Sequence, residues 1–326
     1  MYKIKTAVIG VGSMGQNHAR IYNELSDLRY VIDSNYEQAK SIGTSLSVEY
    51  GDDYNNILDK VDAVSICVPT NLHRETAETF LRAGIDVLVE KPIAENIEDA
   101  KKIIETAKKN SRKLLVGHIE RYNPAVIELQ KLIRKKSAGD IICLSSKRFS
   151  NYPDRIRDVG VISDLGIHDI DVILSTVAES VESVYAVGGQ IKNPRFEDYA
   201  AITIKFKSGK IGIIETNWLT PMKVREISVT TTTNYINLNY MDQSLSVSSS
   251  EFGVIDKSNL YNIPLEKDTQ SIKITNDEPL KLEIDDFLST VADGSKENVT
   301  GEAGLAALQI VAAAKRSIKT GKIVYI

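Results

Sequence analysis

Three residues carry side chains suited to moving a proton during an oxidation: Lys91, Asp164 and His168. Lys91 follows Val87–Val89, an apolar segment typical of a buried strand, and precedes Pro92, which favours an extended backbone at the lysine. Asp164 and His168 are four residues apart and would share one face of a helix. Because an imidazole titrates near neutral pH and a carboxylate can orient it, this set could remove a hydroxyl proton while a hydride leaves the same carbon. A histidine satisfied by local hydrogen bonds is the alternative interpretation.

A glycine-rich segment follows the first apolar stretch, Thr6–Val11, and precedes a helical pattern. Gly10 allows a tight turn, Gly12 lets the backbone approach a pyrophosphate, and Gly15 lets the helix pack closely on the sheet. The N-terminus of that helix adds N–H groups and a positive dipole end. In this context the segment predicts a dinucleotide site. Its residues at that site are Gly10, Gly12, Ser13, Met14 and Gly15.

Asp33 ends the second apolar stretch, Tyr30–Ile32, 18 residues after Gly15. At this spacing a carboxylate accepts hydrogen bonds from the adenosine ribose and repels a 2′-phosphate. No arginine occupies positions 34–36 to receive that phosphate. The sequence therefore favours NAD over NADP, with a strand-end turn as the alternative role of Asp33.

Two further apolar strands, Ala63–Val68 and Val87–Val89, are each followed by a short segment of mostly polar residues. Ligands of open α/β sheets bind at the carboxyl ends of the strands, so these residues should contact the cofactor. They are Pro69, Thr70, Asn71, His73, Glu90 and Lys91. Helix capping is the alternative for Thr70 and Asn71, and His73 could belong only to the helix that follows.

The elements that must position these groups alternate along residues 1–120. Short apolar strands are separated by helical patterns, of which Ile97–Lys109 is the clearest, with Asn96 as its cap. This alternation predicts a doubly wound parallel sheet, the Rossmann fold, as the NAD-binding domain. The strands are Thr6–Val11, Tyr30–Ile32, Ala63–Val68, Val87–Val89 and Leu114–Val116.

The pattern changes in residues 121–326, where alternating strands predominate. We predict a second, α+β domain with a largely antiparallel open sheet, which binds the substrate. Its polar, Ser-rich segment Ser244–Lys257 is predicted to be a surface hairpin or loop, and helices at Leu280–Asp293 and Glu302–Lys319 close the chain. The other predicted elements are a helix from Pro124, strands at Ile141–Ser146, Ala200–Lys207, Lys210–Asn217, Arg225–Thr233 and Tyr235–Asn239, and a helix at Ser163–Thr176.

Composition narrows the possible partners. The 326 residues carry a net charge of −4, which offers no basic field for nucleic acid. No apolar run approaches the ~18 residues of a membrane span, and no signal peptide is visible, so we expect a cytoplasmic protein without membrane contact. Cys67 and Cys143 are expected to be buried, reduced thiols, and the four histidines are too dispersed to predict a metal site.

Four segments together resemble the Gfo/Idh/MocA oxidoreductase family: Gly10–Gly15, Val68–His73, Glu90–Pro92 and Asp164–His168. The resemblance implies a Rossmann domain and a substrate domain whose open sheet forms subunit contacts, hence a homodimer or homotetramer. It also implies a catalytic trio in which His168 takes the hydroxyl proton, Lys91 holds and polarises the substrate oxygen, and Asp164 orients the imidazole or relays the proton. Whether Lys91 or His168 is the base stays open. Many relatives have Gly-Gly before the helix, where this chain has Asp158-Val-Gly-Val-Ile-Ser163.

Further segments bear on the substrate. Residues 117–124 join the predicted domains and should line a ligand cleft, and arginine forks before the catalytic helix suit phosphate oxygens. These segments and residues 217–225 are similar to those of the UDP-N-acetylglucosamine 3-dehydrogenase branch, which implies oxidation at C3 of a nucleotide sugar. The substrate candidates are Glu120, Arg121, Tyr122, Asn123, Arg155, Arg157, Trp218 and Arg225. As an alternative to substrate binding, Trp218 could serve only core packing. The arginines at positions 155 and 157 could belong to a solvated loop.

Two alternatives to a nucleotide-sugar enzyme stay open. A free cyclitol or hexose dehydrogenase of the inositol or glucose type would need no arginine pair. A non-catalytic sensor or regulatory protein would keep the fold and the NAD site, but the intact trio of Lys91, Asp164 and His168 argues against it.

Overall fold

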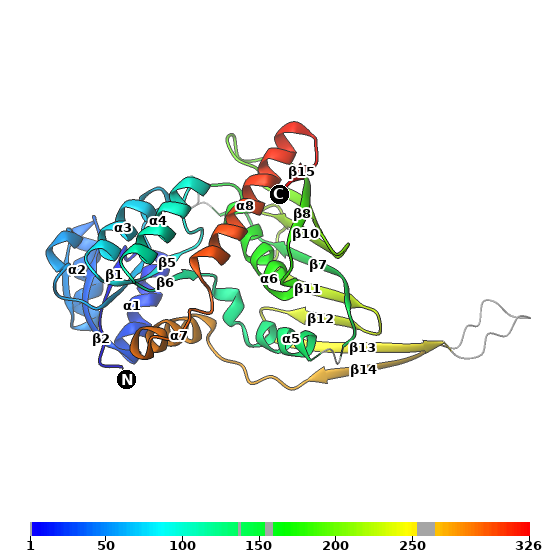
Figure 1. The fold of residues 1–326 in the computed structure, drawn as a ribbon, viewed down its shortest axis with the longest axis horizontal. Helices are drawn as coiled ribbons and strands as arrows, with labels where there is room; N and C mark the ends of the chain where they lie inside the picture. The colour runs from blue at the N-terminus through cyan, green and yellow to red at the C-terminus, as the bar shows by residue number, and fades with distance from the viewer. Residues whose placement is uncertain (1, 136–137, 154–158, 253–264) are drawn as a thin grey trace, which may run out of the picture. The chain divides into compact units, whose positions relative to one another are not determined.

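A computed structural model describes residues 2–135, 138–153, 159–252 and 265–326 (Figure 1). The chain forms two compact units. The first contains Met1–Tyr122 and Glu278–Gln309, and the second contains Asn123–Asp277 and Ile310–Ile326. The sequence-based division near residue 120 differs from this one in residues 278–309, which pack with the first unit.

The first unit is built on a six-stranded sheet with the order β3-β2-β1-β4-β5-β6, in which every adjacent pair is parallel. The order reverses between β1 and β4, and at such a point the loops at the carboxyl ends of the strands diverge and leave room for a ligand. The five predicted strands are present, and Glu49–Gly51 adds a sixth at the edge. The bounds are β1 Lys5–Ile9, β2 Asp27–Ile32, β3 Glu49–Gly51, β4 Ala63–Ile66, β5 Asp86–Glu90 and β6 Leu114–Gly117.

Helices bury apolar stripes against this sheet. Helix α4 spans Ile97–Lys109 as predicted, and the Asn96 side chain caps it by accepting from the Asp99 N–H at 3.0 Å. Helix α7, Pro279–Asp293, contributes Ile284 and Phe287 to the same core, which explains why this distant segment belongs to the first unit. The other helices are α1 Ser13–Leu25, α2 Tyr36–Leu46 and α3 His73–Arg82, with short turns η1 Tyr54–Ile57, η2 Thr70–Leu72 and η3 Ile119–Tyr122.

The second unit is built on a nine-stranded sheet with the order β14-β13-β12-β11-β7-β10-β9-β8-β15. Among the described pairs only β7 and β10 run parallel, so the predicted largely antiparallel sheet is confirmed. The Ser-rich segment forms β13, paired with β14; residues 253–257 lie outside the described residues. The bounds are β7 Ile141–Phe149, β8 Val181–Gly189, β9 Tyr199–Phe206, β10 Ile211–Asn217, β11 Val224–Thr231, β12 Tyr235–Asn239, β13 Ser244–Phe252, β14 Leu265–Ile272 and β15 Val324–Tyr325.

One face of this sheet is covered and the other is open (Figure 1). Helices α5 (Pro124–Arg134) and α6 (Ile167–Val177) pack on the covered face, and α8 (Gly301–Thr320) begins in the first unit and ends in the second. Gly212 permits close packing there, since a Cβ at that position would lie 2.9 Å from Ile173 Cγ2. Among the described residues, no helix is long and apolar enough to span a bilayer.

Both cysteines are free and half-buried. Burial raises the pKa of the Cys67 thiol well above its usual value, with Glu90 and Glu283 acting in the same direction, and burial also raises the pKa of Cys143. Since only the thiolate attacks a disulfide reagent, we expect both thiols to react at pH 8 about tenfold or more slowly than in the unfolded chain, with Cys67 the slower. Ellman titration of the Cys143→Ser variant isolates Cys67; a rate equal to that of the unfolded chain would contradict the expectation.

Candidate active site

The glycine loop has the geometry that a pyrophosphate requires. Gly10 has φ +84°, and a Cβ there would lie 2.8 Å from the Cys67 backbone, while a Cβ on Gly15 would lie 1.8 Å from the Gly10 oxygen. Gly12 faces open space and is the N-cap of α1, with no side chain capping the helix. The exposed Ser13 and Met14 follow it. The loop therefore fits a dinucleotide whose phosphates meet bare backbone N–H groups.

Asp33 lies beside this loop at the end of β2. Its Oδ2 accepts from the Val11 N–H at 2.8 Å and its Oδ1 accepts from the Asn35 N–H at 2.9 Å. The carboxylate is thereby fixed next to the glycine turn, and each oxygen keeps acceptor capacity for a ribose hydroxyl.

We expect Asp33→Ala to weaken NAD binding by about 10- to 100-fold, because two hydrogen bonds to a charged acceptor are lost. NADP should lose less, since the same change removes repulsion of the 2′-phosphate. Titration of both cofactors measures the ratio of the two dissociation constants. Asp27→Ala, at the opposite end of β2 with a side chain that is 42% exposed, is the matched control. An unchanged ratio in Asp33→Ala would separate Asp33 from the ribose.

The other predicted cofactor residues lie at the carboxyl edge of the first sheet. Thr70 and Asn71 form the short turn η2 after β4, where Asn71 is exposed and Thr70 is half-buried. His73 is different: its ring is 1% exposed and its two nitrogens lie 2.9 and 3.0 Å from the carbonyl oxygens of Pro92 and Val68. Its role at the cofactor stays a prediction, and the geometry favours support of the turns over direct contact.

Lys91 follows β5 at this same edge and is half-buried. Its backbone N–H donates to Glu90 Oε2 at 3.1 Å, and its peptide bond to Pro92 is cis. Glu90 is buried and bonds to His18 on α1. Sequence reasoning missed His18, whose only signal is its place on the buried stripe of α1, three residues after Gly15.

Asp164 and His168 lie where α6 begins. Residues Ile162–Gly166 form a π-helical turn that runs directly into α6, and both side chains are half-buried. Such turns recur at functional sites. Gly160 belongs to segment 158–163, where this chain differs from the Gly-Gly of many relatives. It lies against Glu197, because a Cβ at position 160 would be 2.2 Å from Glu197 Oε1. A larger residue at this position would require the Glu197 side chain to move.

Next to His168, the fully buried Asp169 forms an ion pair with Arg148 on β7. Arg148 Nε donates to Oδ2 at 2.7 Å and Nη2 donates to Oδ1 at 3.3 Å. The guanidinium carbon also lies 4.7 Å from the Tyr240 ring centroid. The pair anchors the start of α6 to the central strand of the second sheet.

The predicted substrate residues are divided between the two units. Glu120, Arg121 and Tyr122 form η3, with Glu120 and Tyr122 buried. Asn123 caps α5, since its side chain accepts from the Ala125 N–H at 3.1 Å and donates to the backbone carbonyl oxygen of Tyr240 at 3.0 Å.

The remaining substrate candidates belong to the second unit. Trp218 is 1% exposed, with its ring edge-on to Tyr152, a packing position, and Arg225 is half-buried on β11. Arg155 and Arg157, the other two predicted substrate residues, lie outside the described residues.

The structure brings the predicted groups together within each unit. The glycine loop, Asp33 and Lys91 all lie in the first unit, at the carboxyl edge of its sheet. Asp164 and His168 lie together in the second unit. The convergence of the two sets at one nicotinamide stays a prediction.

Comparisons with known proteins agree with this architecture. The family described as "Oxidoreductase family, NAD-binding Rossmann fold" matches residues 4–118, and the Gfo/Idh/MocA C-terminal domain matches residues 126–237. These matches confirm the predicted Rossmann fold and NAD as its cofactor.

Individual relatives match nearly the whole chain. A UDP-N-acetylglucosamine 3-dehydrogenase of Acidithiobacillus ferrooxidans is 30% identical over 95% of this chain and 97% of its own. A solved structure of that enzyme has a TM-score of 0.89 and covers 98% of each chain at 28% identity. A myo-inositol 2-dehydrogenase of Thermotoga maritima is 28% identical over 97% of this chain and 96% of its own. The chain therefore belongs to the Gfo/Idh/MocA family of oxidoreductases.

Proposed function

We propose that this protein is an NAD-dependent dehydrogenase that oxidises a secondary hydroxyl of a sugar to a ketone, at C3 of a UDP-N-acetylglucosamine-type nucleotide sugar. The observation that carries the proposal is the placement of Lys91 at the sheet edge that also holds the glycine loop and Asp33. Asp164 and His168, at the start of α6, complete the set of groups that the chemistry needs.

Each group of residues has a separate role in the proposed reaction. Bound NAD supplies the hydride acceptor. The glycine loop holds the pyrophosphate, and Asp33 holds the ribose. Lys91 polarises the substrate oxygen, His168 accepts the hydroxyl proton as the hydride leaves carbon, and Asp164 orients the imidazole. Lys91 is the second candidate for the base.

The substrate class rests on likeness to the Acidithiobacillus enzyme, which extends over nearly the whole of both chains. A free cyclitol is the second candidate, supported by the inositol dehydrogenase relative. A regulatory protein without catalysis is disfavoured, because Lys91, Asp164 and His168 are all present.

A screen of NAD reduction tests the proposal, with UDP-N-acetylglucosamine, myo-inositol and glucose supplied in turn. We expect the absorbance of reduced nicotinamide to rise fastest with the nucleotide sugar. Equal or faster reduction with myo-inositol would reassign the substrate, and NAD binding without reduction by any of them would support a regulatory role. We also propose a cytoplasmic location, which cell fractionation would test.

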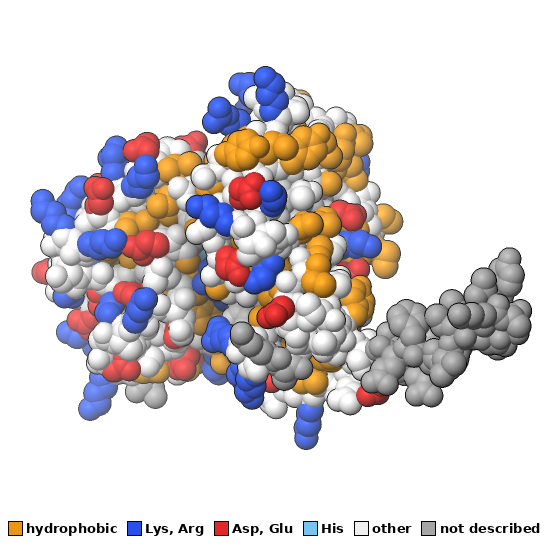
Figure 2. Space-filling model, turned by 45° about the vertical axis from the view of Figure 1, so that its right-hand side comes forward, with side chains coloured by type: hydrophobic (Ala, Val, Ile, Leu, Met, Phe, Trp, Pro, Cys, Tyr) orange, Lys and Arg blue, Asp and Glu red, His pale blue; other side chains and the backbone are white. Residues whose placement is uncertain are grey.

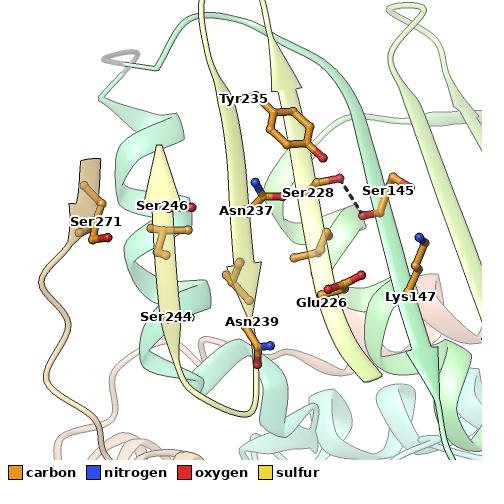
Figure 3. Close-up of a pocket in the computed structure, with 14 residues that line it drawn as sticks. Ser145, Lys147, Glu226, Ser228, Tyr235, Asn237, Asn239, Ser244, Ser246 and Ser271 are labelled. Atoms are coloured by element: carbon orange, nitrogen blue, oxygen red, sulfur yellow. Dashed lines mark hydrogen bonds between the residues drawn. The ribbon is translucent and has the colours of Figure 1, made fainter. Parts of the chain in front are cut away.

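We propose that the open face of the second sheet joins copies of the chain into a homodimer or homotetramer. Strand pairing places Tyr185, Val187, Tyr199 and Ile211 on this one face, each between 38% and 51% exposed. Figure 2 shows hydrophobic side chains gathered in a band on the second unit. Farther along the same face, toward β14, is a groove of about 450 Å³ lined by polar side chains that include Lys147, Glu226 and Asn237 (Figure 3). An apolar band beside a polar surface is typical of a protein interface.

Charge placed on this face tests the assembly. We expect Val187→Glu to reduce the mass measured by light scattering to that of the monomer, because assembly through this face would bury the new carboxylate among apolar side chains. Met241→Glu, at an exposed position in the turn after β12, is the control. A Val187→Glu variant that keeps the mass of the unmodified protein would remove this face from the assembly.

A further inference from the structure

Two buried histidines flank the turn that carries Lys91. His18 belongs to α1 and is 0% exposed, and His73 begins α3 and is 1% exposed. Neither ring is accessible to solvent, so the function of each ring lies in what it holds inside the first unit.

His18 holds the side of the turn that precedes Lys91. Its Nε2 lies 3.0 Å from Glu90 Oε1, and its Nδ1 lies 3.0 Å from Ser65 Oγ on β4. Because a carboxylate only accepts, Nε2 is the donor to Glu90. The other oxygen of Glu90 accepts from the Lys91 N–H at 3.1 Å. One carboxylate therefore links the His18 ring to the backbone of Lys91.

This link is charged. Burial alone would raise the pKa of the Glu90 carboxyl, but the hydrogen bond and charge of His18, together with Lys91, hold it below its usual range. Glu90 is therefore a carboxylate at neutral pH. Hydrogen bonds to a charged acceptor are about twice as strong as neutral ones, so the link is firm.

The same region offers three potential metal ligands, since the ligand atoms of His18, Glu90 and Glu283 lie within 4.8 Å of one another. Both ring nitrogens of His18 are already hydrogen-bonded inside the protein. Ser65 Oγ, one of their partners, is also hydrogen-bonded to Tyr22 Oη at 2.9 Å. We therefore interpret the cluster as a hydrogen-bonded support.

His73 holds the side of the turn that follows Lys91. Its ring nitrogens lie 2.9 Å from the Pro92 oxygen and 3.0 Å from the Val68 oxygen, so it connects the turn after β5 with the turn after β4. A neutral ring donates to one of these carbonyls, and a protonated ring donates to both. Burial lowers the pKa of His73, although the two carbonyls act in the opposite direction.

We propose that His18 and His73 are positioning residues that hold the Glu90-Lys91-Pro92 turn from both sides and so direct the Lys91 ammonium toward the ligand edge of the sheet. The inference rests on the proposed function for the role of Lys91. A displacement of about 1 Å in a reacting group can lower turnover by about 100-fold, so such support has a large effect.

Turnover of His18→Gln and His73→Gln tests this inference. We expect kcat to fall by about tenfold or more while the Kd for NAD changes by less than about threefold. When Lys91 is already replaced by alanine, adding either histidine substitution should lower kcat further by less than about twofold, because both histidines act through Lys91. Thr6→Val is the control: it removes a buried hydroxyl pair with Ser26, 2.9 Å long, at the far end of β1.

Crystal structures of the two variants give a readout independent of activity. We expect Lys91 Nζ to move by about 1 Å or more relative to the unmodified protein. Folded variants in which Lys91 keeps its position and turnover is unchanged would overturn the inference. Full turnover in Lys91→Ala would instead count against the proposed function, whatever the histidine variants do.

Glu90→Gln covers the case in which a histidine variant does not fold. The amide oxygen can still accept from the Lys91 N–H, while the charge that bonds to His18 is lost. We expect the same tenfold or larger loss of kcat. A folded Glu90→Gln protein with unchanged kcat and Lys91 position would contradict the inference.

Discussion

Replacing Lys91 with alanine is expected to lower kcat by about 100-fold or more while the Kd for NAD stays within about threefold. The lysine follows β5 at the carboxyl edge of the sheet, and the pyrophosphate and ribose contacts assigned to the glycine loop and Asp33 do not use its side chain. Loss of the ammonium therefore removes polarisation of the substrate oxygen while the pyrophosphate and ribose contacts stay in place.

The control for this variant is Lys101→Ala, which removes an exposed lysine paired with Glu98 on α4. It should leave kcat unchanged. Steady-state rates and NAD titration distinguish the outcomes: a Lys91→Ala protein with the kcat of the unmodified protein would exclude the lysine from the chemistry. A loss confined to NAD affinity would reassign it to cofactor binding.

Asp169→Ala is expected to lower the free energy of unfolding of the second unit by about 3–5 kcal/mol. The change leaves the Arg148 guanidinium buried, 1% exposed, without the carboxylate that accepts two of its hydrogen bonds. Breaking a buried ion pair by removing one partner costs far more than the pair itself contributes. Because Asp169 follows His168, we also expect turnover to fall even at temperatures where the variant is folded.

Glu182→Ala is the matched control for the ion pair. Glu182 and Lys205 are 2.8 Å apart, but their side chains are 35% and 53% exposed, and such surface pairs contribute about 0–1 kcal/mol. Urea unfolding followed by circular dichroism measures both variants. Equal small losses in the two variants would mean that Arg148 finds another partner when Asp169 is removed.

The elements that sequence alone predicted well are those with strong local signals. Helix α4 has the predicted bounds because an apolar stripe, the Asn96 cap and terminal lysines coincide. Strand β3 has no such signal: it has only three residues, all exposed or half-buried and without an apolar run, and pairing with β2 makes it a strand. Helix α7 was predicted as a helix, but nothing local indicates that it packs in the first unit.

The candidate site also combines residues that local sequence patterns predict with contacts that form only in the folded chain. Gly10, Gly15 and Asp33 could be assigned from spacing, because their roles follow from one turn and two strand ends. The link between His18 and Glu90 could not, since the two residues are 72 positions apart and meet only when α1 packs on the sheet. The π-helical turn before His168 and the buried Arg148–Asp169 pair likewise depend on contacts with the second sheet.

Isotope transfer would show whether this protein moves a hydride from C3 of the nucleotide sugar to NAD. The protein would be incubated with NAD and UDP-N-acetylglucosamine carrying deuterium at C3, and the reduced nicotinamide analysed by mass spectrometry. We expect deuterium to be recovered on the nicotinamide ring, because the hydride leaves the carbon whose hydroxyl proton the protein removes. Reduced nicotinamide without deuterium, or no reduction while unlabelled myo-inositol is oxidised, would contradict it.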